Sequence, residues 1–424
     1  MKILHINQQN TCGGAAKIAN CLVEKLKKKG FITELWYFNK RGDNSNYSRC
    51  IYPLLQRCNN NYVLDQISKK IIYYSRFYFG DVSNPFFKSV NKKIKKWKPD
   101  IIHLHNLHGG WIDLNSIAEL SKTIQIVLTL HDEWIMTGHC AATLDCLGWQ
   151  SSCSECPDLS SYVALKRPIT NKLKKKKERF LSALVKNRGI IVTPSEWLKR
   201  RIKDSGVWNG SEIFVIPNGI DTSKFLAVNK DKSHIRKELG LPDHKKLGLF
   251  VADGGCNTLY KDFLTLKKAI EMIDLLHAED FSLLVAGDQI DHREIVKMNN
   301  IDIIKLGYLG EKELVKYYSA ADIFINPSKA DVFPLVVAEA MAAALPIIST
   351  HVGGIPELVT SEKMGILIPK QSPTRLWQAL MNFLDDKYDY RQMGLNARER
   401  VISHFDSDVM VSNYVNLYSQ FVRR

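Results

Sequence analysis

Residues Ile323–Ser349 read IFINPSKADVFPLVVAEAMAAALPIIS, and this stretch decides the fold. Its apolar ends, Ile323–Asn326 and Pro346–Ser349, predict buried strands, and the segment between them predicts a helix that begins near Leu335. Apolar strands joined by a helix are typical of a parallel sheet that is covered by helices on both faces. The stretch therefore predicts one strand–helix–strand unit of an α/β protein.

The same alternation of apolar runs and helical periodicity extends along the whole chain. Strands are predicted in the first half at Ile3–Ile6, Thr33–Phe38, Ile101–His105, Ile126–Leu130 and Ile190–Thr193. Further strands are predicted at Phe214–Ile216, Leu247–Val251, Ser282–Ala286 and Ile303–Leu306. The two series predict an α/β fold with two doubly wound, Rossmann-like parallel sheets.

A turn signal separates the two series at Pro217–Gly219, which reads P-N-G. We therefore predict an N-terminal domain over residues 1–217 and a C-terminal domain over residues 218–404. A last helix, about Ser407 to Val422, is predicted within residues 405–424. A chain of 424 residues, 45% hydrophobic and 24% charged, has the size and composition of a two-domain globular protein.

The composition argues against a membrane-spanning or secreted protein. No apolar run of about 18 residues occurs, and Met1–Gln9 lacks the apolar core of a signal peptide, so we expect a cytoplasmic location. The net charge is +15, with clusters at Lys25–Lys29, Lys92–Lys98 and Lys172–Lys177. Such a surface favours nucleic acid, anionic lipid or phosphorylated ligands, although a solvated lysine-rich surface is an equally good explanation.

Two glycines follow the first predicted strand, in the segment Thr11–Ala16, which reads T-C-G-G-A-A. Glycines let the backbone approach a ligand closely, and the N–H groups of a following helix attract anions. Gly13 and Gly14 are therefore candidate phosphate-binding residues, with a simple tight turn as the alternative. The segment does not match G-x-G-x-x-G, which argues against a dinucleotide-binding dehydrogenase.

An ordered series of motifs in the second half resembles glycosyltransferase family four. The series includes I-P-N-G-I-D at Ile216–Asp221, A-G-D at Ala286–Asp288, N-P-S at Asn326–Ser328 and D-V-F-P-L-V-V-A-E-A at Asp331–Ala340. It covers about Thr193 to Glu357, and the shared order makes it more specific than any single motif.

The first half resembles a branch of that family found in bacterial exopolysaccharide clusters. The likeness rests on H-L-H-N-L-H-G at His103–Gly109, on H-D-E-W at His131–Trp134 and on the cysteine-rich segment after it. The resemblance implies the GT-B architecture, in which the C-terminal domain holds a nucleotide sugar, the N-terminal domain holds the acceptor, and the last helix returns to the N-terminal domain. It also implies metal-independent transfer, with retained anomeric configuration, to a growing glycan or a polyprenyl-diphosphate-linked acceptor.

The resemblance assigns roles within the opening stretch. Glu339 matches the residue that accepts hydrogen bonds from the ribose hydroxyls, and Asp331 matches an acidic position near the sugar ring, where most members have glutamate. Phe333, Pro334 and Leu335 belong to the same motif and are expected in the donor site. A loop that precedes a helix at the carboxyl end of a strand also offers N–H groups to an anion. The alternative is that the two carboxylates only stabilise the helix dipole, by about 0.5 kcal/mol each.

Lys261 matches the family's phosphate-binding lysine. The family usually adds an arginine five or six residues earlier, where this chain has Cys256 and Gly255, so a bidentate contact to phosphate is lost. We expect Lys261 to act with the N–H groups of Gly254, Gly255 and the first glycine pair instead; an ordinary surface lysine is the alternative. Ala344 also departs from the family, which commonly has glycine before Leu-Pro.

Histidines gather in the first half. In the family, a histidine at the place of His131 contacts the donor sugar from the acceptor domain; the alternative is a polar residue that closes a strand. His103, His105 and His108 alternate along or just beyond one predicted strand, and the last two are candidates for acceptor binding or for a polar cleft wall. A histidine metal site is disfavoured because no acidic residue lies at ligand spacing.

Four cysteines, Cys140, Cys146, Cys153 and Cys156, fall within 17 residues, and the last two form C-x-x-C. In a reducing compartment, thiols this close together indicate a tetrahedral zinc site rather than disulfides, and His139 could replace one ligand. Such a zinc ion would be structural, because an all-cysteine site leaves no position for water. The alternative is four reduced thiols packed in a loop.

Aromatic and basic residues are interleaved before the lysine cluster at Lys92–Lys98. They are Lys69, Lys70, Ile71, Ile72, Tyr73, Tyr74, Arg76, Phe77, Tyr78 and Phe79. This mixture predicts peripheral binding to anionic lipid on the cytoplasmic face of the inner membrane, where a polyprenyl-phosphate acceptor would lie. Packing in the core of a helix is the alternative.

Three other functions are weighed against a glycosyltransferase. A phosphorylase of the same architecture is disfavoured because no cofactor-lysine motif occurs, and a sugar-nucleotide epimerase is disfavoured by the family motifs. A non-catalytic basic scaffold for membranes or nucleic acid is disfavoured because Asp331 and Glu339 are both present and no nucleic-acid-binding motif occurs. The sugar, the nucleotide, the acceptor and the oligomeric state remain open.

Overall fold

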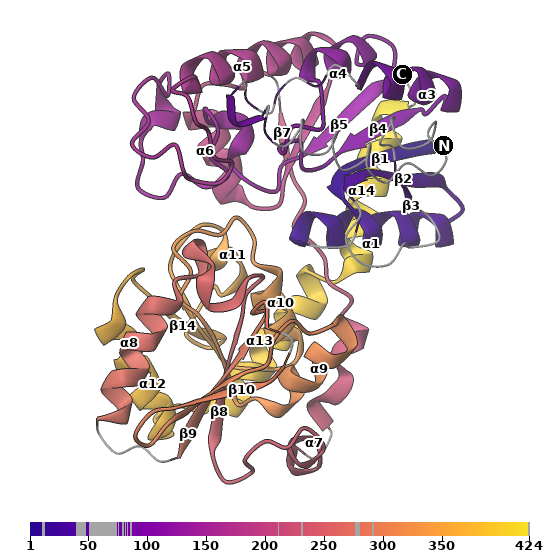
Figure 1. The fold of residues 1–424 in the computed structure, drawn as a ribbon. Coiled ribbons are helices and arrows are strands. Elements are labelled where there is room, and N and C mark those ends of the chain that lie inside the picture. The colour runs from indigo at the N-terminus through magenta and orange to yellow at the C-terminus, as the bar shows by residue number, and fades with distance from the viewer. Residues whose placement is uncertain are drawn as a thin grey trace. The chain divides into compact units, whose positions relative to one another are not determined.

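The computed structural model describes the whole chain except residues 11–12, 40–47, 51–73, 75, 79, 81, 83, 85–86, 211, 230–231, 276–279, 291 and 423–424. The chain forms two compact units (Figure 1). Unit 1 comprises Met1–Pro217 and Met410–Arg424, and unit 2 comprises Asn218–Val409.

Unit 1 contains a sheet of parallel strands. They are β1 (Lys2–Gln9), β2 (Ile32–Asn39), β3 (Ser48–Cys50), β4 (Ile101–Leu104), β5 (Gln125–Thr129), β6 (Ile190–Thr193) and β7 (Ile213–Val215). Their order is β3-β2-β1-β4-β5-β6-β7, and every neighbouring pair is parallel. The chain thus winds outward from β1 in one direction and from β4 in the other, which places the topological switch point between these two strands.

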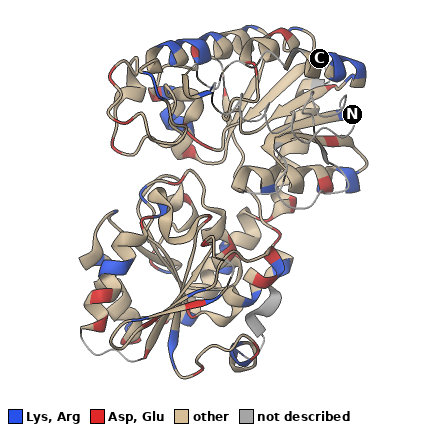
Figure 2. Ribbon diagram, viewed as in Figure 1, with Lys and Arg blue, Asp and Glu red and all other residues tan. Residues whose placement is uncertain are grey.

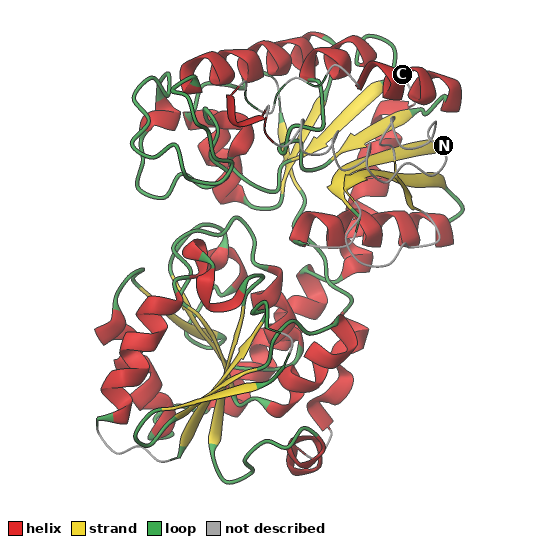
Figure 3. Cartoon of the chain, in the orientation of Figure 1, coloured by secondary structure: helices red, strands yellow, loops and turns green. Residues whose placement is uncertain are grey.

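Helices flank this sheet (Figure 3). They are α1 (Gly14–Lys28), α3 (Phe87–Trp97), α4 (Leu114–Leu120), α5 (Thr170–Lys186), α6 (Glu196–Asp204) and α14 (Ser407–Val422). Most of α14 belongs to unit 1 although it comes last in the chain. Its Tyr414 and Tyr418 are buried and hydrogen-bond Thr129 and His103 of the sheet at 2.8 and 2.7 Å.

Unit 2 repeats the architecture. Its strands are β8 (Lys246–Val251), β9 (Phe281–Ala286), β10 (Glu294–Lys297), β11 (Asp302–Lys305), β12 (Ile323–Asn326), β13 (Ile347–Thr350) and β14 (Gly365–Ile368), in the order β10-β11-β9-β8-β12-β13-β14. Only β10 runs antiparallel to its neighbour. The switch point lies between β8 and β12. Two mostly parallel sheets confirm the predicted α/β fold class.

Some of the helices of unit 2 share a hydrophobic core with its strands. The helices are α7 (Lys232–Glu238), α8 (Phe263–Asp274), α9 (Glu311–Ala320), α10 (Leu335–Ala342), α11 (Ile355–Leu358), α12 (Pro373–Leu384) and α13 (Tyr390–His404). Leu266 of α8, Leu283 of β9 and Leu380 of α12 are fully buried in this core. Each such side chain stabilises the unit by about 2 kcal/mol through removal from water.

Helix α10 ends in a Schellman turn, a geometry that favours glycine at the position of Ala344. The N–H of Leu345 donates to the carbonyl of Ala340 and the N–H of Ala344 donates to that of Met341, both at 3.0 Å. Ala344 therefore adopts the left-handed conformation, with φ +56°. A Cβ in that conformation costs about 1–2 kcal/mol, whereas glycine adopts it without strain.

We expect Ala344→Gly to stabilise unit 2. The relief of strain exceeds the extra backbone entropy that glycine gives the unfolded chain, so the net gain is about 0.5–1 kcal/mol, or a Tm about 1–4 °C higher by calorimetry. Ala343→Gly is the matched control, because Ala343 has φ −78° and gains nothing from glycine, so its Tm should fall. A lower Tm for Ala344→Gly would contradict this account of the turn.

Candidate active site

The predicted donor residues of unit 2 lie at the carboxyl ends of its strands, where α/β sheets bind ligands. Lys261 follows β8 and Asp331 follows β12, on opposite sides of the switch point. Their side chains form an ion pair, with 2.5 Å between Nζ and Oδ2, and are 18% and 16% exposed. The fold thus brings together two residues that are 70 positions apart in the sequence.

Backbone contacts fix the loop that carries Asp331. Gly353 after β13 has φ +59°, and a Cβ there would lie 1.7 Å from the carbonyl oxygen of Asp331. The neighbouring Gly354 donates its N–H to that same oxygen at 3.0 Å. On the other side, the N–H of Lys329 donates to the carbonyl of Tyr260 at 2.8 Å. The loops after β8, β12 and β13 therefore hold one another, and the ion pair lies among them.

Glu339 lies in the second turn of α10 and is buried. The hydroxyl of Tyr318, on α9, donates to its carboxylate at 3.0 Å. Burial and the Glu339 carboxylate together raise the pKa of Tyr318 well above its ordinary value, so the phenol stays a donor. Tyr318 belongs to none of the sequence motifs, and only the packing of α9 against α10 brings it to Glu339.

Phe333, Pro334 and Leu335 are buried at the start of α10. The ring of Phe333 packs edge-on against Phe405, with 5.5 Å between centroids. Pro334 is the N-cap residue, and no side chain of the described residues caps the helix there. The side chains of this predicted set hold the helix in the core, and the amino end of α10 lies beside Asp331.

Gly254 and Gly255 shape the loop after β8 and both have positive φ. Their N–H groups, predicted to bind phosphate, donate to the carbonyls of Gly287 and Ala252 at 3.0 and 2.8 Å. A Cβ on Gly255 would lie 1.8 Å from Oδ1 of Asp288. Both glycines are thus required by close packing, and their amides already have acceptors within the protein.

Gly13 and Gly14 lie in unit 1, at the amino end of α1. Gly13 is the N-cap residue with φ +84°, and both glycines are exposed. No side chain of the described residues caps α1, and its first turn has no acidic residue. The backbone at this helix end is therefore compatible with an anion, as predicted.

The switch point of unit 1 holds a cluster of buried imidazoles. His5 on β1 pairs in register with His103 on β4, and His105 follows β4. Ring nitrogens of these three residues lie within 4.8 Å of one another. Nδ1 of His5 faces Nε2 of His105 at 3.2 Å, and Nδ1 of His105 faces Nε2 of His131 at 3.1 Å. The predicted residue His131 therefore ends a chain of three rings.

Hydroxyl groups engage both nitrogens of His103. Its Nδ1 lies 2.7 Å from the hydroxyl of Tyr418 and its Nε2 lies 2.7 Å from that of Thr129. A metal ion among the rings would have to displace these hydrogen bonds. The cluster is better described as a polar network that fixes His131.

Burial keeps the rings neutral. It lowers the pKa of His5 to about 3 and that of His131 to about 4, and lowers those of His103 and His105 well below 6.5. A neutral imidazole has one donor and one acceptor. Nε2 of His5 is buried without a hydrogen-bond partner among the described residues, and buried N–H groups without acceptors are rarer than free lone pairs.

These constraints assign the direction of the chain of rings. We infer that Nδ1 of His5 carries the proton and donates to His105, and that Nδ1 of His105 in turn donates to Nε2 of His131. Nδ1 of His131 is then left with its hydrogen as a donor.

A second pair supports the same loop: Nε2 of His108 lies 3.0 Å from Oδ2 of Asp132, and this partly exposed carboxylate belongs to the residue directly after His131. Burial opposes ionisation of Asp132, but His108 holds its pKa below the ordinary value.

The predicted membrane segment lies partly outside the described residues, which omit Ile71, Ile72, Tyr73 and Phe79. Tyr74 and Tyr78 are exposed at 55% and 42%. Basic residues lie along α3 and α5 of the same unit (Figure 2). Among the helices that the structure describes, none is long and apolar enough to cross a bilayer.

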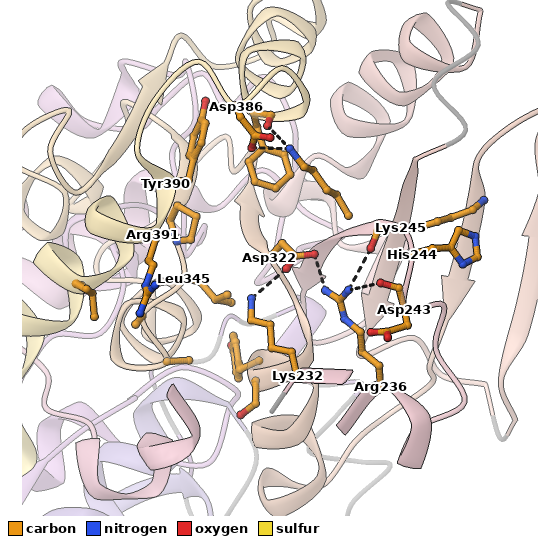
Figure 4. A pocket seen from close by; sticks show the side chains of 18 residues that line it. Lys232, Arg236, Asp243, His244, Lys245, Asp322, Leu345, Asp386, Tyr390 and Arg391 are labelled. Atoms are coloured by element: carbon orange, nitrogen blue, oxygen red, sulfur yellow. Dashed lines mark hydrogen bonds and ion pairs between the residues drawn. The ribbon is translucent and has the colours of Figure 1, made fainter. Parts of the chain in front are cut away.

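A cavity of about 610 Å³ in unit 2 lies at the other edge of the sheet (Figure 4). Its lining includes Lys246 at the start of β8 and Asp322 just before β12. Cations and carboxylates neutralise one another there: Asp322 pairs with Arg236 at 2.5 Å and with Lys232 at 3.0 Å. This cavity is at the amino ends of the strands and does not belong to the donor site.

The neutral histidines predict that unit 1 loses stability in mild acid. Their pKa values are lower in the folded state than the 6.5 of an unfolded chain, so only the unfolded state gains protons as the pH falls below 6.5. At pH 5, His5 alone should lower the free energy of unfolding by about 2 kcal/mol relative to pH 7. Hydrogen exchange of β1 and β4 amides would measure this loss.

The substitution His5→Asn should reduce that pH dependence, because the amide can replace Nδ1 but does not titrate. His404→Asn, which changes an exposed ring on α13, is the control and should leave the pH profile of unit 1 unchanged. If the free energy of opening, obtained from exchange of β1 and β4 amides after correction for the intrinsic rate at each pH, is the same at pH 7 and pH 5 in the unaltered chain, the rings are not held neutral by the fold.

Comparisons with known proteins agree with this geometry. Relatives include the putative colanic acid biosynthesis glycosyl transferase WcaC of Escherichia coli K12, which is 24% identical over 99% of both chains. The capsular polysaccharide biosynthesis glycosyltransferase CapM of Staphylococcus aureus is 24% identical over 55% of this chain and 62% of its own.

Solved structures share the fold. Sucrose-phosphate synthase from Thermosynechococcus elongatus superimposes with a TM-score of 0.70 at 19% identity, over 99% of this chain and 98% of its own. HepE of Anabaena, in complex with UDP-glucose, gives 0.66 at 16% identity, over 99% and 100%. These neighbours are GT-B glycosyltransferases, as the predicted architecture requires.

Two family models match the chain. "Glycosyl transferases group 1" matches residues 231–400, within unit 2, and "Glycosyltransferase Family 4" matches residues 12–224, half of the chain. The order of the motifs, the two Rossmann-like sheets and the acidic and basic residues at the switch point are all features of the same family. The chain belongs to glycosyltransferase family four.

Proposed function

We propose that this glycosyltransferase moves a sugar from a nucleotide-diphosphate-sugar to a growing glycan in surface polysaccharide biosynthesis, with retention of the anomeric configuration. The Lys261–Asp331 ion pair at the switch point is the observation that carries the proposal. Two mostly buried charges lose much of their hydration, and their mutual attraction offsets only part of that loss. Within the described part of the chain no other ion pair involves either residue, and such a site is suited to a ligand that engages both.

A nucleotide sugar offers both partners. Its diphosphate takes the ammonium of Lys261, and the freed carboxylate of Asp331 accepts a hydrogen bond from a sugar hydroxyl. Glu339, in the second turn of the helix that follows the Asp331 loop, accepts hydrogen bonds from the ribose. The solved HepE structures contain UDP or UDP-glucose, which supports a donor of this chemical class.

The transfer itself breaks the bond between the anomeric carbon and the diphosphate oxygen and forms a bond to an acceptor hydroxyl on the same face of the sugar. The acceptor proton passes to the leaving diphosphate. Lys261 and the amino end of α10 stabilise the negative charge that develops there, so the chemistry needs no metal ion. His131 presents Nδ1–H as a neutral donor to the sugar, fixed by His105.

The acceptor is proposed to be a glycan linked to polyprenyl diphosphate at a membrane surface. The basic faces of α3 and α5 and the exposed rings of Tyr74 and Tyr78 support peripheral contact with anionic lipid. The similarity to the E. coli and S. aureus relatives supports a polysaccharide product. A sugar-nucleotide epimerase would convert its donor without any acceptor, so product analysis distinguishes it from a transferase.

Lys261→Ala and Glu339→Ala should each lower kcat/KM for donor turnover at least about 100-fold, because each removes a charged contact to the donor. Lys316→Ala is the matched control: Lys316 also pairs with a carboxylate at 2.5 Å, but on the exposed surface of α9. The purified full-length chain would be assayed with a panel of nucleotide sugars. Full activity of both site variants would refute the assignment of the donor site.

Asp331→Glu should change which donor is preferred rather than abolish transfer. The added methylene moves the carboxylate by about 1.5 Å relative to the sugar, enough to alter orientation while Lys261 remains in reach. The measurement is the ratio of kcat/KM for two nucleotide sugars that differ in one hydroxyl. An unchanged ratio, with an equal loss for both donors, would show that Asp331 does not contact the sugar.

A further inference from the structure

The cysteine-rich insert of unit 1, between β5 and α5, encloses a small cavity of about 20 Å³. Its lining includes all four cysteines of the insert, Cys140, Cys146, Cys153 and Cys156, together with His139. A space of this size holds a single water molecule or ion. The thiols are all free and partly buried, so no disulfide joins them.

Backbone amides are directed at the sulfurs. The N–H of Gly148 donates to Sγ of Cys146 at 3.4 Å. Burial raises the pKa of the Cys153 and Cys156 thiols, and the amides of Gly138 and Asp158, which hydrogen-bond their sulfurs, oppose that rise. Hydrogen bonds of this kind are the outer contacts that orient and stabilise metal-bound ligands.

His139 has the orientation of a metal ligand. Its Nδ1 lies 2.9 Å from the carbonyl of Val163, which can only accept, so Nδ1 carries the hydrogen. Nε2 is then a lone pair, and it faces Sγ of Cys156 at 3.2 Å. A lone pair and a thiolate repel each other unless a proton or a metal ion lies between them. Ligating histidines commonly donate their other N–H to a carbonyl in this manner.

A buried lysine beside the cavity needs a negatively charged partner. Lys174 of α5 is 2% exposed, and its ammonium donates to the carbonyl oxygens of Trp149 and Ser151. Among the described residues no carboxylate pairs with it, and carbonyls do not neutralise a charge. Cys153 of this cavity interacts electrostatically with Lys174, so its thiolate is a candidate counter-charge.

We propose that the insert binds one structural zinc ion, with Cys146, Cys153 and Cys156 as thiolate ligands and a fourth ligand from the adjacent pair His139 and Cys140. The geometry favours His139 for the fourth position. In the described part of the chain, no three of these donor atoms lie within 4.8 Å of one another. Rotation of a cysteine side chain between staggered rotamers moves its sulfur by about 3 Å, so side-chain rotation can bring the donor atoms closer together.

The ion would fix the wall beside His131. The N–H of Glu133 donates to the carbonyl of Ala141, and the N–H of Ala141 donates to that of Tyr162, at 3.0 and 2.7 Å. The hydroxyl of Tyr162 in turn lies 3.4 Å from Nδ1 of His108, the partner of Asp132. Zinc at the centre of the insert therefore orders a segment that contacts the predicted acceptor side, and it takes no part in the chemistry.

The first test is metal analysis and native mass spectrometry of the full chain, purified with reductant and without added metal or chelator. We expect about one zinc ion per chain and thiols of the insert that react with Ellman's reagent only after a chelator removes the metal. Zinc far below one ion per chain, with freely reactive thiols, would overturn the proposal. The proposal would also be overturned if the measured mass of the chain were lower by the hydrogens that disulfide formation removes.

Variants identify the ligands. Cys153→Ser should release the zinc, and Cys50→Ser, a cysteine at the end of β3, is the control that should retain it. His139→Ala should release zinc while Cys140→Ser retains it; the reverse result would overturn the assignment of His139. Because the Cys153 variant can also misfold, Lys174→Met provides a second measure: it should raise the dissociation constant for zinc at least about tenfold in chelator competition. None of these readouts depends on transferase activity.

Discussion

Parallel strands deliver their loops to one edge of a sheet, and in unit 2 these loops pack so closely that backbone oxygens occupy the place of side chains. A Cβ on Gly353 would lie 1.7 Å from the carbonyl oxygen of Asp331, and one on Gly287 would lie 1.8 Å from that of Ala252. Asp331 is therefore fixed by a neighbouring loop that tolerates only glycine. Its ion pair with Lys261, and the donor site proposed around that pair, depend on this close packing.

The fold could be predicted from the sequence because a strand buried on both faces appears as a continuous apolar run. That signal found most strands of both sheets, including β12 and β13 of the opening stretch. It failed where burial is incomplete. Strand β10 is an exposed antiparallel edge with two charged residues among four, so it produced no such run. Strand β14 is only partly buried, and its short apolar run G-I-L-I was not assigned to a strand.

Site residues that belong to a sequence motif could be predicted. Residues whose role depends on partners distant in the sequence could not. Lys261 and Asp331 come from the family resemblance, and the fold places them in contact. The amides of Gly254 and Gly255 fit a phosphate loop in sequence, yet they donate to the carbonyls of Gly287 and Ala252. His5 belongs to no motif, and only its register with β4 brings it to the other rings.

The proposed donor site and the proposed zinc site share one feature, a lysine that is largely removed from water. Each of these lysines needs a negatively charged partner that water cannot replace. The partner of Lys261 is the carboxylate of Asp331. A diphosphate can replace this carboxylate, and Asp331 is then free to accept from a sugar hydroxyl. A partner that can be exchanged in this way suits a binding site. Lys174 is surrounded by carbonyls and thiols, so its proposed counter-charge is a set of thiolates that zinc would hold permanently. Both lysines thus need a counter-charge. The site of Lys261 suits a ligand because its counter-charge can be exchanged, and the site of Lys174 suits a structural ion because its counter-charge stays.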